Sequence, residues 1–203
     1  MPFIIRPPRM RTAIAACAAA LMVGAVPAQA SKFQEITSAS KCTEPTLYQP
    51  FLSFGDSNYY ALPAGESYDN FTGKGWVLSG GARFIPTTLQ DGATGYVLDM
   101  PANSTATSPN FCLNPSYPKA RAMIADVYGP PNLSFYVTYE SSGKTPSSNA
   151  PAPSGNVWVL SPTFALYPSS TAGWQLGKFT FVSGSNASDV RIYNFYVDPY
   201  VRR

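Results

Sequence analysis

Short apolar runs separated by turn-forming residues make up most of the chain after Leu47. Clusters of Gly, Pro, Ser and Asn, such as 129–131 and 183–186, separate runs that are rich in aromatic and β-branched residues. Beyond residue 30, no apolar series with helical spacing is long enough for a helix. The pattern therefore predicts an all-β fold, a single-domain antiparallel β-sandwich with very little helix. The predicted strands cover 57–62, 76–79, 83–86, 95–100, 119–127, 133–140, 157–161, 174–182 and 189–197.

Strict alternation in segment 133–140 predicts a strand that is buried on one face only. Leu133, Phe135, Val137 and Tyr139 share the apolar face, whereas Ser134, Tyr136, Thr138 and Glu140 share the polar one. Tyr136 is thus the aromatic residue expected to point outward.

In two other strands the apolar alternation changes phase, which is typical of a β-bulge. In 174–182 the change occurs at Gly177. In the last strand it occurs near Tyr193-Asn194, where a kink would keep four apolar side chains inward: Val190, Ile192, Phe195 and Val197.

Segment 141–155 (SSGKTPSSNAPAPSG) is rich in Ser, Pro and Ala and has one charged residue. Such a composition offers little for packing, so we expect a mobile loop between two strands. Its two interpretations are a flap over a site and an ordinary surface loop.

Residues 1–30 have the features of a secretory signal peptide. Three arginines precede a small, apolar stretch at 12–26, and Ala28-Gln29-Ala30 fits a cleavage site. The apolar stretch is shorter than the roughly 20 residues of a membrane span, so no membrane insertion is expected. We predict a secreted, extracellular protein with a signal peptide at 1–30, a polar N-terminal tether at 31–46 and the sandwich at 47–203.

Removing the signal peptide changes the charge. The chain has 14 basic and 11 acidic residues, and the signal holds three of the basic ones, which leaves 11 of each. A neutral mature chain has no electrostatic basis for binding nucleic acid or anionic lipid. We expect a monomer.

The chain contains no histidine, which limits its chemistry. Ser-His-Asp and Cys-His nucleophile systems and histidine zinc sites are excluded. A small glycan-cleaving enzyme that depends on carboxylates remains, but it needs two facing carboxyl groups, and no catalytic pair is recognisable. We therefore expect that the protein is not an enzyme and that it requires no cofactor. Asp56 and Asp198 are candidate ligands of a structural calcium ion.

Two cysteines remain after the signal peptide, Cys42 and Cys112. In an oxidising compartment an even pair predicts a disulfide bond, and two free buried thiols are the alternative.

The order of several motifs resembles that of galactose-binding-like jelly-roll domains, among them carbohydrate-binding modules. The segment PAGESYDN at 63–70 precedes a Gly-Trp strand at 75–82, and the strands at 133–139, 174–181 and 192–198 follow in the same order. The resemblance covers about 57–201, and the chain also looks like one of the small exported bacterial proteins. It implies a jelly roll and a non-catalytic module that binds an extracellular or cell-envelope glycan.

For such a module we predict a site on the polar face of strand 133–140. A sugar needs an aromatic platform beside hydrogen-bonding groups. The candidate glycan-binding residues are Tyr136, Thr138, Glu140, Arg191, Tyr193, Tyr196 and Trp158. The alternative function is an envelope-associated structural or protein-interaction module.

Overall fold

The computed structural model describes residues 33–63, 71–129, 132–140, 143–150, 156–169, 171, 173–185 and 188–199. All of them belong to one compact unit, Phe33–Arg203. The predicted signal peptide lies outside the described residues, as do 64–70, which hold most of the first motif of the resemblance.

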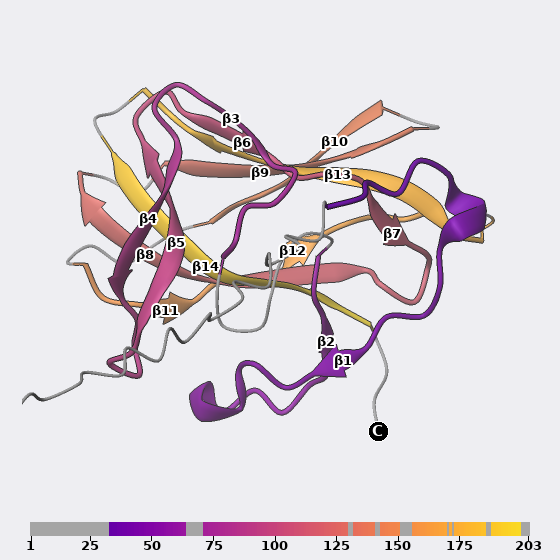
Figure 1. Ribbon diagram of the computed structural model, residues 1–203, viewed down its shortest axis with the longest axis horizontal. Coiled ribbons are helices and arrows are strands. Elements are labelled where there is room, and N and C mark those ends of the chain that lie inside the picture. Colours follow the sequence, from indigo (N-terminus) through magenta and orange to yellow (C-terminus); the bar gives the residue numbers. More distant parts are fainter. Residues whose placement is uncertain are drawn as a thin grey trace, which may run out of the picture. The chain divides into compact units, whose positions relative to one another are not determined.

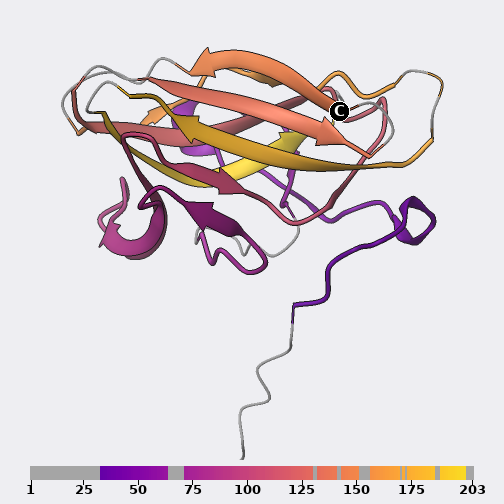
Figure 2. The same cartoon turned by 90° about the horizontal axis from the view of Figure 1, so that it is seen from above.

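Two antiparallel sheets face each other, as the sequence predicts, and Figures 1 and 2 show them as two layers. The eight-stranded sheet contains β1 (Leu47–Tyr48), β2 (Tyr60–Ala61), β4 (Arg83–Thr88), β5 (Thr94–Pro101), β8 (Lys119–Tyr128), β11 (Val159–Leu160), β12 (Phe164–Ala165) and β14 (Asp189–Asp198). The six-stranded sheet contains β3 (Val77–Ser79), β6 (Thr105–Thr107), β7 (Phe111–Leu113), β9 (Leu133–Tyr139), β10 (Gly143–Ala150) and β13 (Gln175–Ser183). The described helices are two short 3-10 turns, η1 (Ala39–Lys41) and η2 (Leu52–Phe54).

Strand β14 lies in the middle of the eight-stranded sheet. It pairs with β8 along one side and with β5 and then β2 along the other. The six-stranded sheet runs β10-β9-β13-β6-β3, with β7 also beside β13. The chain alternates between the sheets, which gives the sandwich its non-local contacts.

Alternating side chains of facing strands fill the space between the sheets. The apolar face of β9 is buried there, and Phe135 contacts Phe164, Phe179, Phe181 and Phe195 at centroid distances of 4.6 to 5.8 Å. The predicted inward face of strand 133–140 is confirmed.

The predicted kink in the last strand is confirmed. The pairing of β14 with β8 shifts between Tyr193 and Tyr196, and Asn194 has a φ of 48°. Asparagine tolerates this left-handed conformation better than most residues. All four apolar side chains, Val190, Ile192, Phe195 and Val197, therefore point into the core between the sheets.

The predicted bulge at Gly177 is wrong. From Gly177 to Ser183, strand β13 pairs with β9 in one continuous register. Leu176 instead lies on the outer face, opposite Cys112 of β7, and is only 2% exposed. The phase change reflects an apolar residue covered on the other side of the sheet.

The prediction of a loop over 141–155 is wrong for 143–150, where the structure has strand β10. It pairs antiparallel with β9, from Gly143 opposite Tyr139 to Ala150 opposite Leu133. Backbone hydrogen bonds to a well-formed neighbour are enough for an edge strand, whatever the apolar content of its sequence.

The N-terminal segment is attached to the six-stranded sheet. The Asn110 amide N–H donates to the Glu35 carboxylate at 3.1 Å, and Asn110 Nδ2 donates to the Ile36 carbonyl at 2.9 Å. The predicted disulfide joins Cys42 to Cys112, with a Cα–Cα distance of 5.7 Å. The disulfide prediction is confirmed, and residues predicted as a tether lie against β7.

No helix among the described residues is long and apolar enough to cross a membrane.

Candidate functional site

A second hydrophobic cluster covers the outer face of the eight-stranded sheet, opposite the core. The bulge at Asn194 turns both Tyr193 and Tyr196 to this face while Phe195 points into the core. The cluster contains Phe51, Tyr60, Leu89, Val97, Met123, Tyr193 and Tyr196. Segment 49–62 thus folds back over a sheet face that would otherwise be apolar and exposed.

Aromatic packing fixes this segment to the sheet. Phe51 is fully buried and makes edge contacts with Tyr60 at 4.9 Å and with Tyr196 at 5.6 Å. Trp158 lies edge-on to Tyr193 at 4.5 Å, and its Nε1 donates to the Thr88 carbonyl at 3.4 Å. Edge-to-face pairs of this kind stabilise by about 0.5–1.5 kcal/mol each beyond the area they bury.

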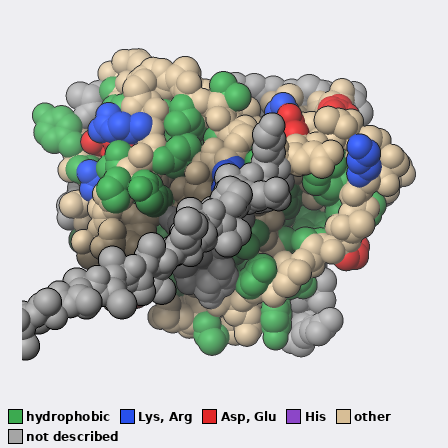
Figure 3. Space-filling view, in the orientation of Figure 1, with side chains coloured by type: hydrophobic (Ala, Val, Ile, Leu, Met, Phe, Trp, Pro, Cys, Tyr) green, Lys and Arg blue, Asp and Glu red, His purple; other side chains and the backbone are tan. Residues whose placement is uncertain are grey.

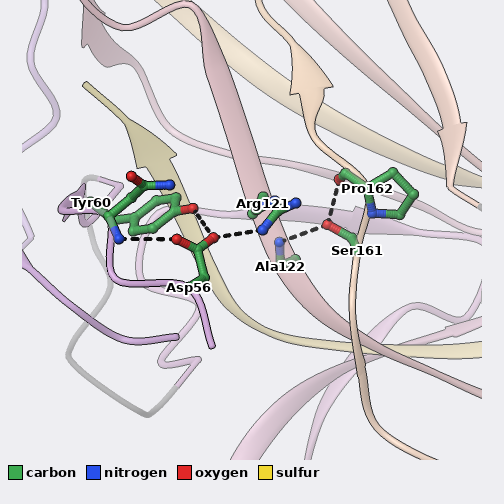
Figure 4. A network of polar contacts seen from close by, with 7 residues as sticks. Asp56, Tyr60, Arg121, Ala122, Ser161 and Pro162 are labelled. Carbon is green, nitrogen blue, oxygen red and sulfur yellow. Dashed lines mark hydrogen bonds and ion pairs between the residues drawn. The ribbon is translucent and has the colours of Figure 1, made fainter. Parts of the chain in front are cut away.

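A polar network ties the same segment to β8 (Figure 4). One oxygen of Asp56, Oδ2, accepts a hydrogen bond from the Tyr60 hydroxyl at 2.6 Å and pairs with Arg121 Nη1 at 2.6 Å. The other oxygen, Oδ1, accepts from the Asn58 amide at 3.0 Å. The residue after Arg121, Ala122, donates its amide N–H to the Ser161 hydroxyl at 3.0 Å, which joins the 161–162 turn to the same strand.

These contacts shift two pKa values. Burial acts to raise the pKa of Asp56, but the hydrogen bonds from Tyr60 and Asn58 and the charge of Arg121 outweigh it and hold the pKa below its usual range. Burial, together with the hydrogen bond to Asp56, raises the pKa of Tyr60. Asp56 is thus a carboxylate and Tyr60 a phenol at neutral pH.

The same geometry bears on the predicted calcium ligands. Arg121 supplies the positive charge beside Asp56. Burial raises the pKa of Asp198, and the negative charge of nearby Asp56 raises this pKa further. Among the residues that the structure describes, no group of three or more His, Cys, Asp or Glu is placed to hold a metal ion. An arginine therefore neutralises the carboxylate that was a candidate calcium ligand.

An open groove lies beside the anchored segment. Its cavity of about 630 Å³ is within the range of ligand sites. One wall is the stretch around η2, the other is the turn between β4 and β5, and the bulge of β14 also contributes. The lining residues are Gln49, Pro50, Leu52, Ser53, Phe54, Leu89, Gln90, Asp91, Tyr193 and Asn194.

Local hydrogen bonds hold the β4–β5 turn. The Leu89 amide donates to the Ala93 carbonyl at 2.8 Å, and the Ala93 amide donates to Asp91 Oδ1 at 2.9 Å. Gly92 has a φ of 83°, a conformation that suits glycine in such a turn. Gln90 and Asp91 are therefore held at the rim of the groove.

The groove combines apolar and uncharged polar groups. Leu52 and Phe54 provide the accessible apolar surface, and Leu52 is 57% exposed, whereas Tyr193 forms the floor and is only 4% exposed. The polar groups are the amides of Gln49, Gln90 and Asn194 and the hydroxyl of Ser53. Asp91 is the one charged side chain among the described lining residues.

The predicted site residues lie on two opposite faces of the sandwich. Tyr193 lines the groove, and the ring of Trp158 packs against the ring of Tyr193. Tyr136 and Thr138 lie on the outer face of the six-stranded sheet, and Glu140 is exposed just beyond the end of β9. The seven residues therefore do not form one site.

Two more of the predicted residues, Tyr196 and Arg191, have structural roles on the outer face of the eight-stranded sheet. Tyr196 is fully buried, so it is unsuited to be a stacking platform. Arg191 Nε pairs with Asp99 Oδ1 at 3.1 Å, and Asp99 Oδ2 pairs with Arg83 Nη2 at 2.5 Å. Asp99 is fully buried, so this row of three charges braces β4, β5 and β14.

Most groove residues carry no signal in the sequence. The stretch around η2 has no distinctive pattern, and the one available signal was the Asp91-Gly92 turn.

On the face shown in Figure 3, basic and acidic side chains are interspersed rather than gathered by sign.

No protein-family profile matches the sequence, and no curated protein matches it. Several solved structures of carbohydrate-binding modules are similar in part. A family 61 module, solved in complex with β-1,4-galactotriose, has a TM-score of 0.47 and 10% identity, covering 66% of this chain and 99% of its own. The CBM22-1 xylan-binding domain of Paenibacillus barcinonensis Xyn10C has a TM-score of 0.46 and 14% identity, covering 68% and 93%. The C-terminal family 22 module of Clostridium thermocellum Xyn10B has a TM-score of 0.45 and 14% identity, covering 71% and 97%.

These likenesses, at TM-scores below 0.5, add nothing to the two-sheet fold described above.

Proposed function

We propose that this chain is a secreted, non-catalytic β-sandwich module that binds an extracellular or cell-envelope glycan in the groove beside η2. The lining of the groove supports this most directly. A sugar ring has an apolar C–H face and a rim of hydroxyl groups. Leu52 and Phe54 match the first, and the side chains of Gln49, Ser53 and Gln90 match the second.

The charge of the groove favours binding over cleavage. Glycoside hydrolysis normally uses two carboxyl groups on either side of the bond. Within the described part of the groove lining, Asp91 is alone, and one of its oxygens accepts the Ala93 amide. We expect micromolar to millimolar affinity, because an open groove orders few groups and desolvates much polar surface.

The test is affinity electrophoresis and calorimetry with a panel of neutral β-1,4-linked polysaccharides and their oligosaccharides. The double variant Ser53→Ala/Gln90→Ala removes one polar group from each wall, and both side chains are exposed. Two lost hydrogen bonds should weaken binding about tenfold while the melting temperature stays within a few degrees.

The matched control is Tyr136→Ala, on the opposite face of the sandwich. It should bind as tightly as the wild type. If Tyr136→Ala loses binding and the groove variant keeps it, the site is on the polar face of β9. If no glycan in the panel is retained, the protein-interaction module takes the place of this proposal, and exposed Leu52 is where a partner would be sought.

A further inference from the structure

A second cavity, of about 620 Å³, lies where four segments distant in sequence meet. Residues Glu44, Pro45 and Leu47 come from the N-terminal segment, Tyr59 precedes β2, Ser116 and Tyr117 belong to the β7–β8 turn, and Pro199 follows β14. None of the predicted site residues lines it.

Covalent and hydrogen bonds hold two of its walls together. The Cys42–Cys112 disulfide lies just before both of them in sequence, two residues before Glu44 and four before Ser116. The Tyr117 hydroxyl donates to Glu44 Oε2 at 2.6 Å, directly between the walls. The second pocket is therefore fixed by specific bonds between its walls.

Local hydrogen bonds and ring packing hold the β7–β8 turn. The Ser116 amide donates to Asn114 Oδ1 at 2.8 Å, and the Tyr117 amide donates to the Asn114 carbonyl at 2.9 Å. The ring of Tyr117 is 3% exposed and packs against Trp174 at 5.7 Å. Tyr117 thus has its hydroxyl fixed on Glu44 and its ring fixed on Trp174.

The lining suits a sugar ring. Tyr59, Pro45 and Leu47 supply apolar surface over the buried Tyr117 and Pro199, and the Glu44 carboxylate and the Ser116 hydroxyl supply polar groups. A carboxylate accepts hydroxyl hydrogen bonds that are stronger than neutral ones. Glu44 is the one charged residue in the described lining, so an anionic ligand would be repelled.

We infer that the second pocket is an independent binding site for a neutral sugar unit. Its ligand class rests on the proposed function, but its residues do not overlap with those of the groove. The stretch from Glu44 to Phe54 supplies a wall to each site, so one short segment serves both. A module with two sites would bind a polysaccharide more tightly than either site alone.

The experiment is a titration of the isotope-labelled mature protein with neutral β-1,4-linked di- and trisaccharides, followed by amide NMR shifts. We expect saturable shifts at Ser116 and Tyr117 that persist in the Ser53→Ala/Gln90→Ala variant, in which binding in the groove is weakened. Tyr59→Ala should weaken the affinity obtained from these shifts about tenfold, because it removes one stacking face. Glu44→Gln should weaken this affinity about threefold, because a neutral amide replaces the charged acceptor.

The matched control is Tyr128→Ala, a similarly sized truncation at an exposed tyrosine that lines neither cavity. It should leave the shifts at Ser116 and Tyr117 unchanged. Melting curves of all variants identify any that fails to fold, and Tyr59→Phe, which keeps the ring, should bind like the wild type.

The outcomes separate the two proposals. Shifts confined to Gln90, Asp91 and their neighbours would overturn the second pocket and leave the groove proposal standing. Shifts at Ser116 and Tyr117 alone would support the second pocket and count against the groove. Equal binding by wild type, Tyr59→Ala and Glu44→Gln would overturn the second pocket. A lack of shifts at both places would overturn both proposals.

Discussion

At the scale of residues, three aspartates on the eight-stranded side have two kinds of surroundings. Asp56 and Asp99 are paired with arginines, whereas Asp189 lies close to the Asp99 charge. Burial raises the pKa of Asp189, and the Asp99 charge raises it further. The pH dependence of unfolding therefore differs in sign between Asp56 and Asp189.

We expect Asp189→Asn to stabilise the protein at neutral pH. A carboxyl group whose folded-state pKa lies above its unfolded value of about 3.9 costs stability once it ionises. The variant should raise the free energy of unfolding by about 1 kcal/mol at pH 7, which is a few degrees in melting temperature. The gain should vanish below about pH 4, where wild-type Asp189 is protonated in both states. Thermal scans at pH 7 and pH 3.5 measure it, and a gain that is equal at both would contradict this account.

Asp56→Asn should act in the opposite direction. The folded-state pKa of Asp56 is lowered, so its stabilisation is present above the unfolded pKa and is lost as the pH falls through the folded one. We expect a loss of about 2 kcal/mol at pH 7, because Arg121 is left partly buried without its partner. Urea unfolding at pH 7 and pH 3 checks this, and the difference from wild type should shrink at the lower pH.

At the scale of elements, the bulge in β14 decides which side chains reach the groove. One residue in a left-handed conformation, Asn194, lets Tyr193 and Tyr196 share the outer face while Phe195 and Val197 stay in the core. A regular strand would place Tyr193, Phe195 and Val197 on one face. The floor of the groove therefore depends on a single backbone conformation.

Substitutions at Asn194 test this dependence. Asn194→Val should destabilise by about 1–2 kcal/mol, because a β-branched residue is strained at positive φ. Asn194→Gly adopts the conformation freely and should cost less than Asn194→Val. Urea unfolding of the two variants measures the difference, and equal losses would show that the side chain rather than the backbone matters.

At the scale of the whole molecule, the disulfide joins the N-terminal segment to the six-stranded sheet. Cys42 and Cys112 are 70 residues apart, so their bond closes a large part of the chain. In the chain-entropy account, closure of such a loop stabilises by about 4 kcal/mol.

Reduction, or the Cys42→Ser/Cys112→Ser variant, should lower the melting temperature by roughly 10 °C, since 1 kcal/mol corresponds to about 2–4 °C at this size. The sandwich should still form, because both cysteines lie outside its aromatic core. Calorimetry with and without reductant measures the shift. Thiol titration of the denatured, unreduced mature protein should find no free thiol.

The sequence by itself determined the fold class and much of the strand pattern. Alternation in 133–140 identified the buried face of β9, and the phase change near Tyr193-Asn194 identified the bulge, because both depend on neighbouring residues along one strand. The disulfide was predicted from the even number of cysteines that follow the predicted signal peptide. Edge strand β10 was missed, because its pairing depends on the backbone of β9 rather than on its own composition.

Only the tertiary structure decided where a site can form. Tyr136 and Tyr193 both appeared as outward aromatics, yet they lie on opposite faces, because alternation gives the phase of a strand and not the sheet to which it belongs. Leu176 lies on the outer side of its sheet and is nevertheless buried there, which the phase change at Gly177 does not reveal. The groove and the second pocket are lined by loops and turns from distant parts of the chain, and packing alone brings such residues together.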